Sequence, residues 1–314
     1  MIKLIYKPID PCGNEQEEYK KIHHELFRSA DIDNNWIEWY HEKIRASDPR
    51  LSFTRTYGLY DGNRLIGIWS VEPKIMRNNT NELIKVGRCF AVGISSDYRR
   101  MGLFVSLSEY AIKSERERAE YDFIIGFPQT GRSVVGGHLK AGWEEISFID
   151  TFSVDLSNND GKFFRSDVRQ MTIFLNSATT LNVPNSFDEN SSYRNMRFLM
   201  HPKLQYIVYQ YDNAHIVLKP YSTFCHILEM QGSKENVIRL IEVSKSVCKR
   251  HGLLELNVWN NSDAFYHDTL IGCGFTNGAQ HGLPITIIAV RIKALMKLKI
   301  EKHFNFGMGV EEGY

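Results

Sequence analysis

The sequence predicts a mixed α/β protein of the α+β kind, with two tandem domains that each hold a mixed, mostly antiparallel sheet flanked by helices. Three observations predict this class. Signals for a hairpin, strand, helix, strand, helix and strand follow one another over residues 57–156, and the same order recurs over residues 206–292. The repeating unit is about a hundred residues, which indicates a duplicated domain rather than a solenoid.

The first copy opens with a hairpin, because Asp61-Gly62 lies between two apolar runs and Asp-Gly is a strong turn signal. Apolar residues recur at helical spacing on one face of residues 103–117, and charged residues occupy the other face. The remaining elements expected here are strands over residues 84–94, 121–127 and 146–156, with a short helix before the last of them.

Residues 1–50 precede this unit, and a strand over residues 2–6 and two helical patterns are expected there. The second copy begins with a hairpin around Asp212-Asn213. Its later elements are expected over residues 225–230 (strand), 237–248 (helix), 253–259 (strand), 263–271 (short helix) and 285–292 (strand). The polar run over residues 157–161 is the best linker candidate. We therefore expect domains over residues 1–160 and 161–314.

Composition limits the function classes. The chain has 314 residues, 43% hydrophobic and 24% charged, which is room for two globular domains. Its formal net charge of +1 gives no global basic field for nucleic acid. No segment approaches the ~20 apolar residues of a spanning helix, and the N-terminus lacks a signal-peptide pattern. We therefore expect a cytoplasmic protein that binds neither membrane nor nucleic acid.

The five cysteines are scattered and include no CxxC pair. An odd, scattered set favours reduced thiols over a disulfide framework or a zinc site, so no metal is expected. Cys89, inside a strand and without a base at useful spacing, is expected to pack in the core rather than act as a nucleophile.

One turn is the candidate site for binding a phosphate group. Residues 95–104 leave a strand, turn on Gly102 and enter a helix. A helix N-terminus offers unpaired N–H groups and the positive end of the helix dipole, so it suits phosphate. Arg99 and Arg100 add positive charge, and Gly102 lets the backbone approach a ligand closely. A plain surface turn is the alternative interpretation.

The sequence resembles the GNAT acetyltransferase superfamily. Residues 98–104, Tyr-Arg-Arg-Met-Gly-Leu-Phe, look like that family's R/Q-x-x-G-x-G/A pyrophosphate loop. Residues 138–143, His-Leu-Lys-Ala-Gly-Trp, look like its Tyr-x-Lys-x-Gly-Phe ending. The element order agrees over residues 55–156, about a third of the chain, and the second copy extends the resemblance to double-domain members.

The resemblance implies an N-acetyltransferase that uses acetyl-CoA and direct attack by an amine on the thioester. The first domain would be catalytic. The degenerate second domain, which lacks the pyrophosphate loop, would form one wall of the acceptor site. Backbone N–H groups near Val92 and Gly93 would polarise the thioester carbonyl. The implied coenzyme-binding residues are Val92, Gly93, Ile94, Arg99, Arg100, Met101, Gly102, Leu103, Phe104 and Arg132, although Arg132 equally suits an anionic acceptor.

The sequence departs from the family pattern in three places. Phe104 stands where the loop usually ends on a small residue. The strand over residues 86–94 lacks the acid that often serves as base, and Glu82 and Asp97 are the nearest. His138 occupies the position of the usual general-acid tyrosine. We expect His138 to be catalytic, protonating the departing thiolate or shuttling the amine proton; a packing role is the alternative.

The acceptor is expected to be a polar small molecule, most specifically a nucleotide-linked amino sugar, with an aminoglycoside-like amine or a protein lysine as alternatives. Trp36, Trp39 and Tyr40 would stack on the acceptor, or else pack against the sheet, and Phe127 follows the strand that should meet it. Two rival functions remain: an aminoacyl-tRNA-dependent transferase and a non-catalytic acyl-CoA sensor.

Overall fold

The computed structural model of the chain describes residues 3–27, 32–157, 168–174, 185–280 and 284–293. The first half contains β1 (Leu4–Ile9), α1 (Gln16–Leu26), α2 (Asn34–Glu38), the π-helical turn η1 (Trp39–Lys43), α3 (Ile44–Ala46), β2 (Arg55–Asp61), β3 (Arg64–Arg77), β4 (Leu83–Ile94), the 3-10 turn η2 (Ser96–Tyr98), α4 (Leu103–Arg118), β5 (Phe123–Gly126), α5 (Ser133–Lys140) and β6 (Glu144–Asp155).

The second half contains β7 (Arg169–Gln170), β8 (Ser186–Phe187), α6 (Ser191–Arg194), the π-helical turn η3 (Asn195–Leu199), β9 (Ile207–Tyr211), β10 (Ala214–Pro220), β11 (Phe224–Gln231), α7 (Lys234–Arg250), β12 (Glu255–Asn260), α8 (His267–Gly272), β13 (Thr276–Asn277) and β14 (Ile285–Arg291). The predicted class, a mixed and mostly antiparallel sheet flanked by helices in each half, is confirmed. The linker candidate lies beyond Ser157 outside the described residues, and the domain boundary stays a prediction.

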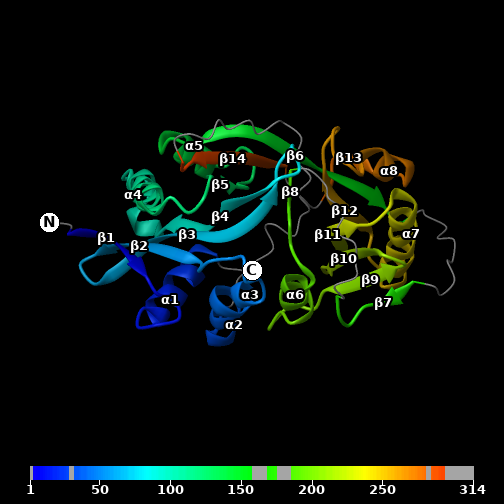
Figure 1. Cartoon of the computed structure of the whole chain (residues 1–314), viewed down its shortest axis with the longest axis horizontal. Coiled ribbons are helices and arrows are strands. Elements are labelled where there is room, and N and C mark those ends of the chain that lie inside the picture. The colour runs from blue at the N-terminus through cyan, green and yellow to red at the C-terminus, as the bar shows by residue number, and fades with distance from the viewer. Residues whose placement is uncertain (1–2, 28–31, 158–167, 175–184, 281–283, 294–314) are drawn as a thin grey trace.

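The first sheet has the strand order β1-β2-β3-β4-β5-β14-β6 (Figure 1). Neighbouring strands are antiparallel except β4 and β5, which run parallel and are connected through α4. The β2–β3 hairpin turns at Gly62, which has a left-handed φ of 56°. The Asp-Gly turn expected there is therefore confirmed.

Helices cover both faces of this sheet (Figure 1). Helix α4 buries Leu103, Leu107 and Ala111 on the sheet, together with Trp143 after α5. This is the apolar face expected from the helical spacing. The opposite face of the sheet packs against the cluster that α1, α2 and η1 contribute, including Tyr19 and Ile37.

The second sheet has the order β6-β12-β11-β10-β9-β7. Strands β11 and β12 run parallel and are connected by α7, which repeats the relation of β4 and β5 in the first sheet. Helix α7 buries Val237, Leu240 and Ile241 against this sheet. The expected amphipathic helix and its buried face are confirmed.

Strand β6 belongs to both sheets. Its first half, up to Ile149, pairs with β14, and its second half, from Asp150, pairs with β12. Strand β14 in turn lies between β5 and the first half of β6. Each sheet thus contains strand segments from the other half of the chain: β14 and the short β8, which pairs with β3, in the first sheet, and the end of β6 in the second.

The placement of β14 differs from the expectation that residues 285–292 end the second copy. The strand exists, but it completes the first sheet. Its residues from Ile285 to Val290 are all buried, so both of its faces are apolar. A pattern that is apolar on both faces does not specify which sheet receives the strand.

One core joins the two halves. It contains Phe123 and Ile125 of β5, Ile287 of β14, and Val217 and Leu228 of the second sheet.

Among the described residues, no helix has the length and apolar character needed to cross a bilayer.

Candidate functional site

The central feature of the first sheet is the point where β4 and β5 separate. The parallel pairing of these strands covers Val86 to Arg88 on β4 and ends at the pair Arg88–Ile125. Strand β5 ends at Gly126, whereas β4 continues to Ile94. The last residues of β4 therefore have an edge that β5 does not cover, beside the start of α4 (Figure 1).

The same residues of β4 contain a bulge in their pairing with β3, on the edge opposite the uncovered one. Ile68 of β3 pairs with Gly93 and Ser70 pairs with Phe90, so Ala91 and Val92 together face Trp69. Ala91 has a left-handed φ of 44°, which is unusual for a residue with a side chain. A bulge of this kind turns the backbone N–H groups away from the regular ladder and increases the local twist.

The expected phosphate loop follows β4 directly. Arg99, Arg100, Met101 and Gly102 are exposed, and α4 begins at Leu103 without a side-chain cap. Arg100 and Gly102 have left-handed φ values of 63° and 75°. Arg99 Nε donates a hydrogen bond to the Ile94 carbonyl oxygen at 3.2 Å, which ties the loop to the end of β4. The loop and the strand edge thus form one continuous surface.

His138 lies on α5 with its side chain 4% exposed. Its ring packs edge-on between Phe104, with centroids 5.0 Å apart, and Trp143, with centroids 4.6 Å apart. Within the described part of the chain, His138 Nδ1 has no hydrogen-bond partner. Burial lowers the pKa of His138 to about 4, so the imidazole is uncharged at neutral pH.

A buried charge cluster, which was not anticipated from the sequence, lies in register with the last β4–β5 pair. Glu72 of β3 pairs with Arg88 of β4 in the sheet. The Glu72 carboxylate accepts hydrogen bonds from Arg88 Nη2 at 2.6 Å and Lys74 Nζ at 2.7 Å, and from Tyr40 Oη at 2.7 Å and Tyr193 Oη at 2.8 Å. Helical segments from both halves are therefore linked through one carboxylate.

The charge state of Glu72 follows from its neighbours. Burial alone would raise its pKa, but the positive charges of Arg88 and Lys74 outweigh this and hold the pKa of Glu72 well below 4.5. Both carboxylate oxygens already accept hydrogen bonds. Glu72 is thus a saturated anion and a poor proton acceptor. One feature of the sequence indicates this cluster: two opposite charges, Glu72 and Lys74, lie inside a strand whose interior is mostly apolar.

Several solved structures have a backbone fold similar to that of this chain. A GCN5-related N-acetyltransferase from Anabaena variabilis superposes with a TM-score of 0.67 at 10% identity, over 95% of this chain and 75% of that chain. A probable N-acyltransferase from Enterococcus faecalis gives 0.65 at 8% identity, over 93% and 73%. A tandem GNAT protein from the clavulanic acid biosynthesis pathway gives 0.59 at 11% identity, over 94% and 100%.

The chain has the GNAT fold. The likeness expected from residues 98–104 and 138–143 is therefore confirmed at the level of the fold. No protein-family model matches the chain, and no curated protein matches it in sequence.

Within this GNAT fold, the loop before α4 has the open space and the uncapped backbone donors that suit an anion. A Cβ added at Gly102 would meet no atom within 4 Å, so open space lies beside the loop backbone. The uncapped N-terminus of α4 directs its first N–H groups and its dipole toward this side. Leu103 is buried beneath the loop, whereas Phe104 is half-buried and faces α5.

The corresponding place in the second half of the GNAT fold is closed. Ser233 caps α7 by accepting a hydrogen bond from the Asn236 backbone N–H. Tyr266 Oη donates to the Gly232 carbonyl oxygen at 2.8 Å, across the turn that enters α7. A Cβ at Gly232 would lie 2.2 Å from Ala214 Cβ, so no open space remains there. These contacts agree with the missing phosphate loop of the second copy.

The remaining predicted site residues lie around the separated strands. Arg132 is exposed just before α5 and donates from Nε to Gln129 Oε1 at 3.1 Å. Gly93 faces α1, where a Cβ would lie 2.9 Å from Leu26. Phe127, at the end of β5, is 4% exposed and lies against Trp259 of the second sheet, with centroids 6.4 Å apart. Their binding roles stay predictions.

Trp36, Trp39 and Tyr40 are buried in the core beneath β3 and β4. Trp36 stacks on Tyr40 with centroids 4.9 Å apart, and Trp39 Nε1 donates to the Met196 carbonyl oxygen. Of the two interpretations of these rings, packing against the sheet is the one that the contacts show. A stacking role toward a ligand stays a prediction.

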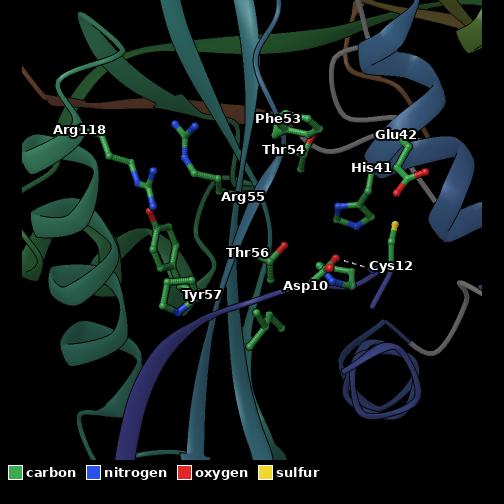
Figure 2. A pocket seen from close by; sticks show the side chains of 13 residues that line it. Asp10, Cys12, His41, Glu42, Phe53, Thr54, Arg55, Thr56, Tyr57 and Arg118 are labelled. Atoms are coloured by element: carbon green, nitrogen blue, oxygen red, sulfur yellow. Dashed lines mark hydrogen bonds between the residues drawn. The ribbon is translucent and has the colours of Figure 1, made fainter. Parts of the chain in front are cut away.

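A separate pocket of about 320 Å³ lies where β1 leaves the edge of β2 (Figure 2). Its lining includes no residue of the loop over residues 95–104. The side chains of Cys12, His41 and Glu42 line it. Burial, together with the nearby charges of Glu42 and Asp10, raises the pKa of the Cys12 thiol to about 12. The thiol is therefore protonated at neutral pH and is not an activated nucleophile. All five cysteines are free.

Proposed function

We propose that the protein is an N-acetyltransferase that uses acetyl-CoA to acetylate the amine of a polar small molecule. The observation that carries this proposal is the continuous surface formed by the uncovered edge of β4, its bulge at Ala91, and the uncapped start of α4. This surface offers an extended backbone edge next to an anion site. A thioester with a long amide-containing arm and a diphosphate needs that combination.

The loop would hold the coenzyme's diphosphate. The backbone of Arg100 to Phe104 would donate hydrogen bonds, and Arg99 and Arg100 would add charge at the exposed turn. The coenzyme's arm would lie along the edge of β4 between Phe90 and Ile94. Once bound, acetyl-CoA supplies an acetyl group activated as a thioester.

The chain's own groups would then act in two ways. Backbone N–H groups near Val92 and Gly93, redirected by the bulge, would stabilise negative charge on the carbonyl oxygen. The uncharged imidazole of His138 would accept the amine proton and return it to the departing sulfur. This shuttle combines the two roles expected for His138, and an imidazole that is uncharged at neutral pH can begin it by accepting the amine proton.

The acceptor that we propose is a nucleotide-linked amino sugar. The proposal is motivated by the second half of the chain, whose Trp259 packs against Phe127 just after β5 and which would form one side of the acceptor site. The likeness to a tandem GNAT protein of a biosynthesis pathway favours a small molecule. The buried rings of Trp36, Trp39 and Tyr40 give this proposal no exposed stacking surface.

A panel of amines tests the activity. The purified chain is incubated with acetyl-CoA and, in turn, a nucleotide-linked amino sugar, an aminoglycoside and a lysine peptide, and free thiol release is followed. We expect thiol release with the amino sugar in the wild-type protein and loss of this release in Gly102→Glu. Release with another amine alone would contradict the acceptor class, and no release from a protein that does bind acetyl-CoA would favour a sensor.

A further inference from the structure

Phe104 and Gly137 form a size-matched pair between α4 and α5. Phe104 is the second residue of α4 and stands where the phosphate loop usually ends on a small residue. A Cβ added at Gly137 would lie 2.7 Å from Phe104 Cδ1 and 2.8 Å from Cε1, closer than real contacts of this type. The aromatic ring of Phe104 therefore occupies the space that the missing side chain of Gly137 leaves open.

The same ring fixes the orientation of His138. Phe104 meets the imidazole edge-on, at an interplanar angle of 89°, and Trp143 meets it from another side at 68°. A working imidazole is commonly oriented by a hydrogen bond to its second nitrogen. His138 Nδ1 makes no hydrogen bond to any described residue, so aromatic packing has to supply the orientation.

We infer that Phe104 is a positioning residue for His138, and that Gly137 provides the room that this requires. The inference rests on the proposed function, because the position of His138 matters for the reaction only if acetyl transfer occurs there. Phe104 lies two residues after Gly102, so one side chain connects the phosphate loop to the imidazole. The large residue at this position is thus matched by the glycine on α5.

Four variants test the pair: Phe104→Ala, Phe104→Leu, Gly137→Ala and the double variant Phe104→Ala/Gly137→Ala. Each variant is prepared with isotope-labelled histidine, so that NMR reports the titration and the tautomer of the His138 ring. Phe104→Leu keeps most of the buried volume if Phe104→Ala fails to fold. Leu139→Ala, an exposed change on the same helix, is the control.

In the wild-type protein His138 is expected to stay uncharged down to about pH 4. Phe104→Ala admits water and should move the titration toward the ordinary 6.5, and Phe104→Leu should move it part of the way. Gly137→Ala displaces the ring of Phe104 and should alter the tautomer signal. The double variant should differ from the sum of the two single changes, because the residues are in contact.

Acetyl-CoA binding, measured by calorimetry, separates the positioning role of Phe104 from the proposed acetyltransferase function. With the acceptor identified in the amine panel, Phe104→Leu should lower kcat about tenfold or more, while the KM for acetyl-CoA stays nearly constant. A His138 titration and tautomer in both Phe104 variants that match wild type would overturn the inference. Failure of the wild-type protein to bind acetyl-CoA would instead overturn the proposed function, whatever the His138 signals show.

Discussion

Glu72→Ala is expected to destabilise the folded protein by about 3–5 kcal/mol, because it removes the carboxylate that Arg88 and Lys74 share, while Lys74 keeps its contact with the carboxylate of Glu189. Arg88 is 4% exposed and Lys74 is 2% exposed, so solvent cannot replace the lost partner. For a chain of this length the loss lowers the thermal midpoint by about 5–8 °C. Thermal and chemical unfolding measure the effect.

Glu117→Ala removes an exposed glutamate from α4 and is the matched control, since it should leave the midpoint unchanged. A wild-type midpoint in Glu72→Ala would show that the cluster does not hold the two halves together. Glu72→Gln keeps the size of the side chain and removes only its charge.

The same carboxylate predicts a pH dependence. Because the pKa of Glu72 lies well below 4.5 in the folded state, its stabilising contribution is complete above about pH 4.5 and declines as the pH falls toward the folded-state pKa. The difference in unfolding free energy between wild type and Glu72→Gln should therefore shrink below pH 4.5. A difference that grew on acidification would contradict the assigned charge state.

His138→Ala is expected to lower kcat by roughly 10²–10⁴ without weakening acetyl-CoA binding, because a positioned proton shuttle acts on the chemical step. The imidazole is uncharged above about pH 4, so its contribution should not vary between pH 6 and 8. Steady-state kinetics with the acceptor found in the panel, and calorimetry with acetyl-CoA, measure the two effects separately.

Leu139→Ala is the control for His138→Ala, since Leu139 is exposed on the same helix. An unchanged kcat in a correctly folded His138→Ala variant would leave His138 with a packing role only. A lower kcat accompanied by an equal loss of acetyl-CoA affinity would assign the residue to binding.

The sequence predicted those features that depend on neighbours along the chain. The hairpin at Gly62, the buried faces of α4 and α7, and the turn before Leu103 are each specified by a few consecutive residues. The bulge at Ala91 lies at the strand end where polarising N–H groups were expected. Local propensity and periodicity are sufficient for such elements.

The features that escaped prediction depend on residues distant in sequence. Glu72 meets Tyr193 across 121 positions, and no periodic pattern records that contact. Strand β14 is apolar on both faces, so its sequence is compatible with either sheet. Trp36 and Tyr40 satisfy the pattern of a ligand-stacking pair and that of a core pair equally well, and the sequence does not record how deeply they are buried.

The most direct test of the account is thermal unfolding with and without acetyl-CoA, on wild type and on Gly102→Glu. At 100-fold over Kd, a ligand that binds only the folded state adds about 2.7 kcal/mol, which raises the midpoint by about 4 °C here. Gly252→Glu is the control, because Gly252 has a φ of +74° against +75° for Gly102, also faces open space, and lies beyond α7.

We expect a higher midpoint with acetyl-CoA in wild type and in Gly252→Glu. The increase should be lost in Gly102→Glu, where a negatively charged side chain would fill the open space beside the phosphate loop. No shift in wild type would contradict the transferase proposal, and the GNAT fold alone would remain. An undiminished shift in Gly102→Glu would place the coenzyme away from this loop.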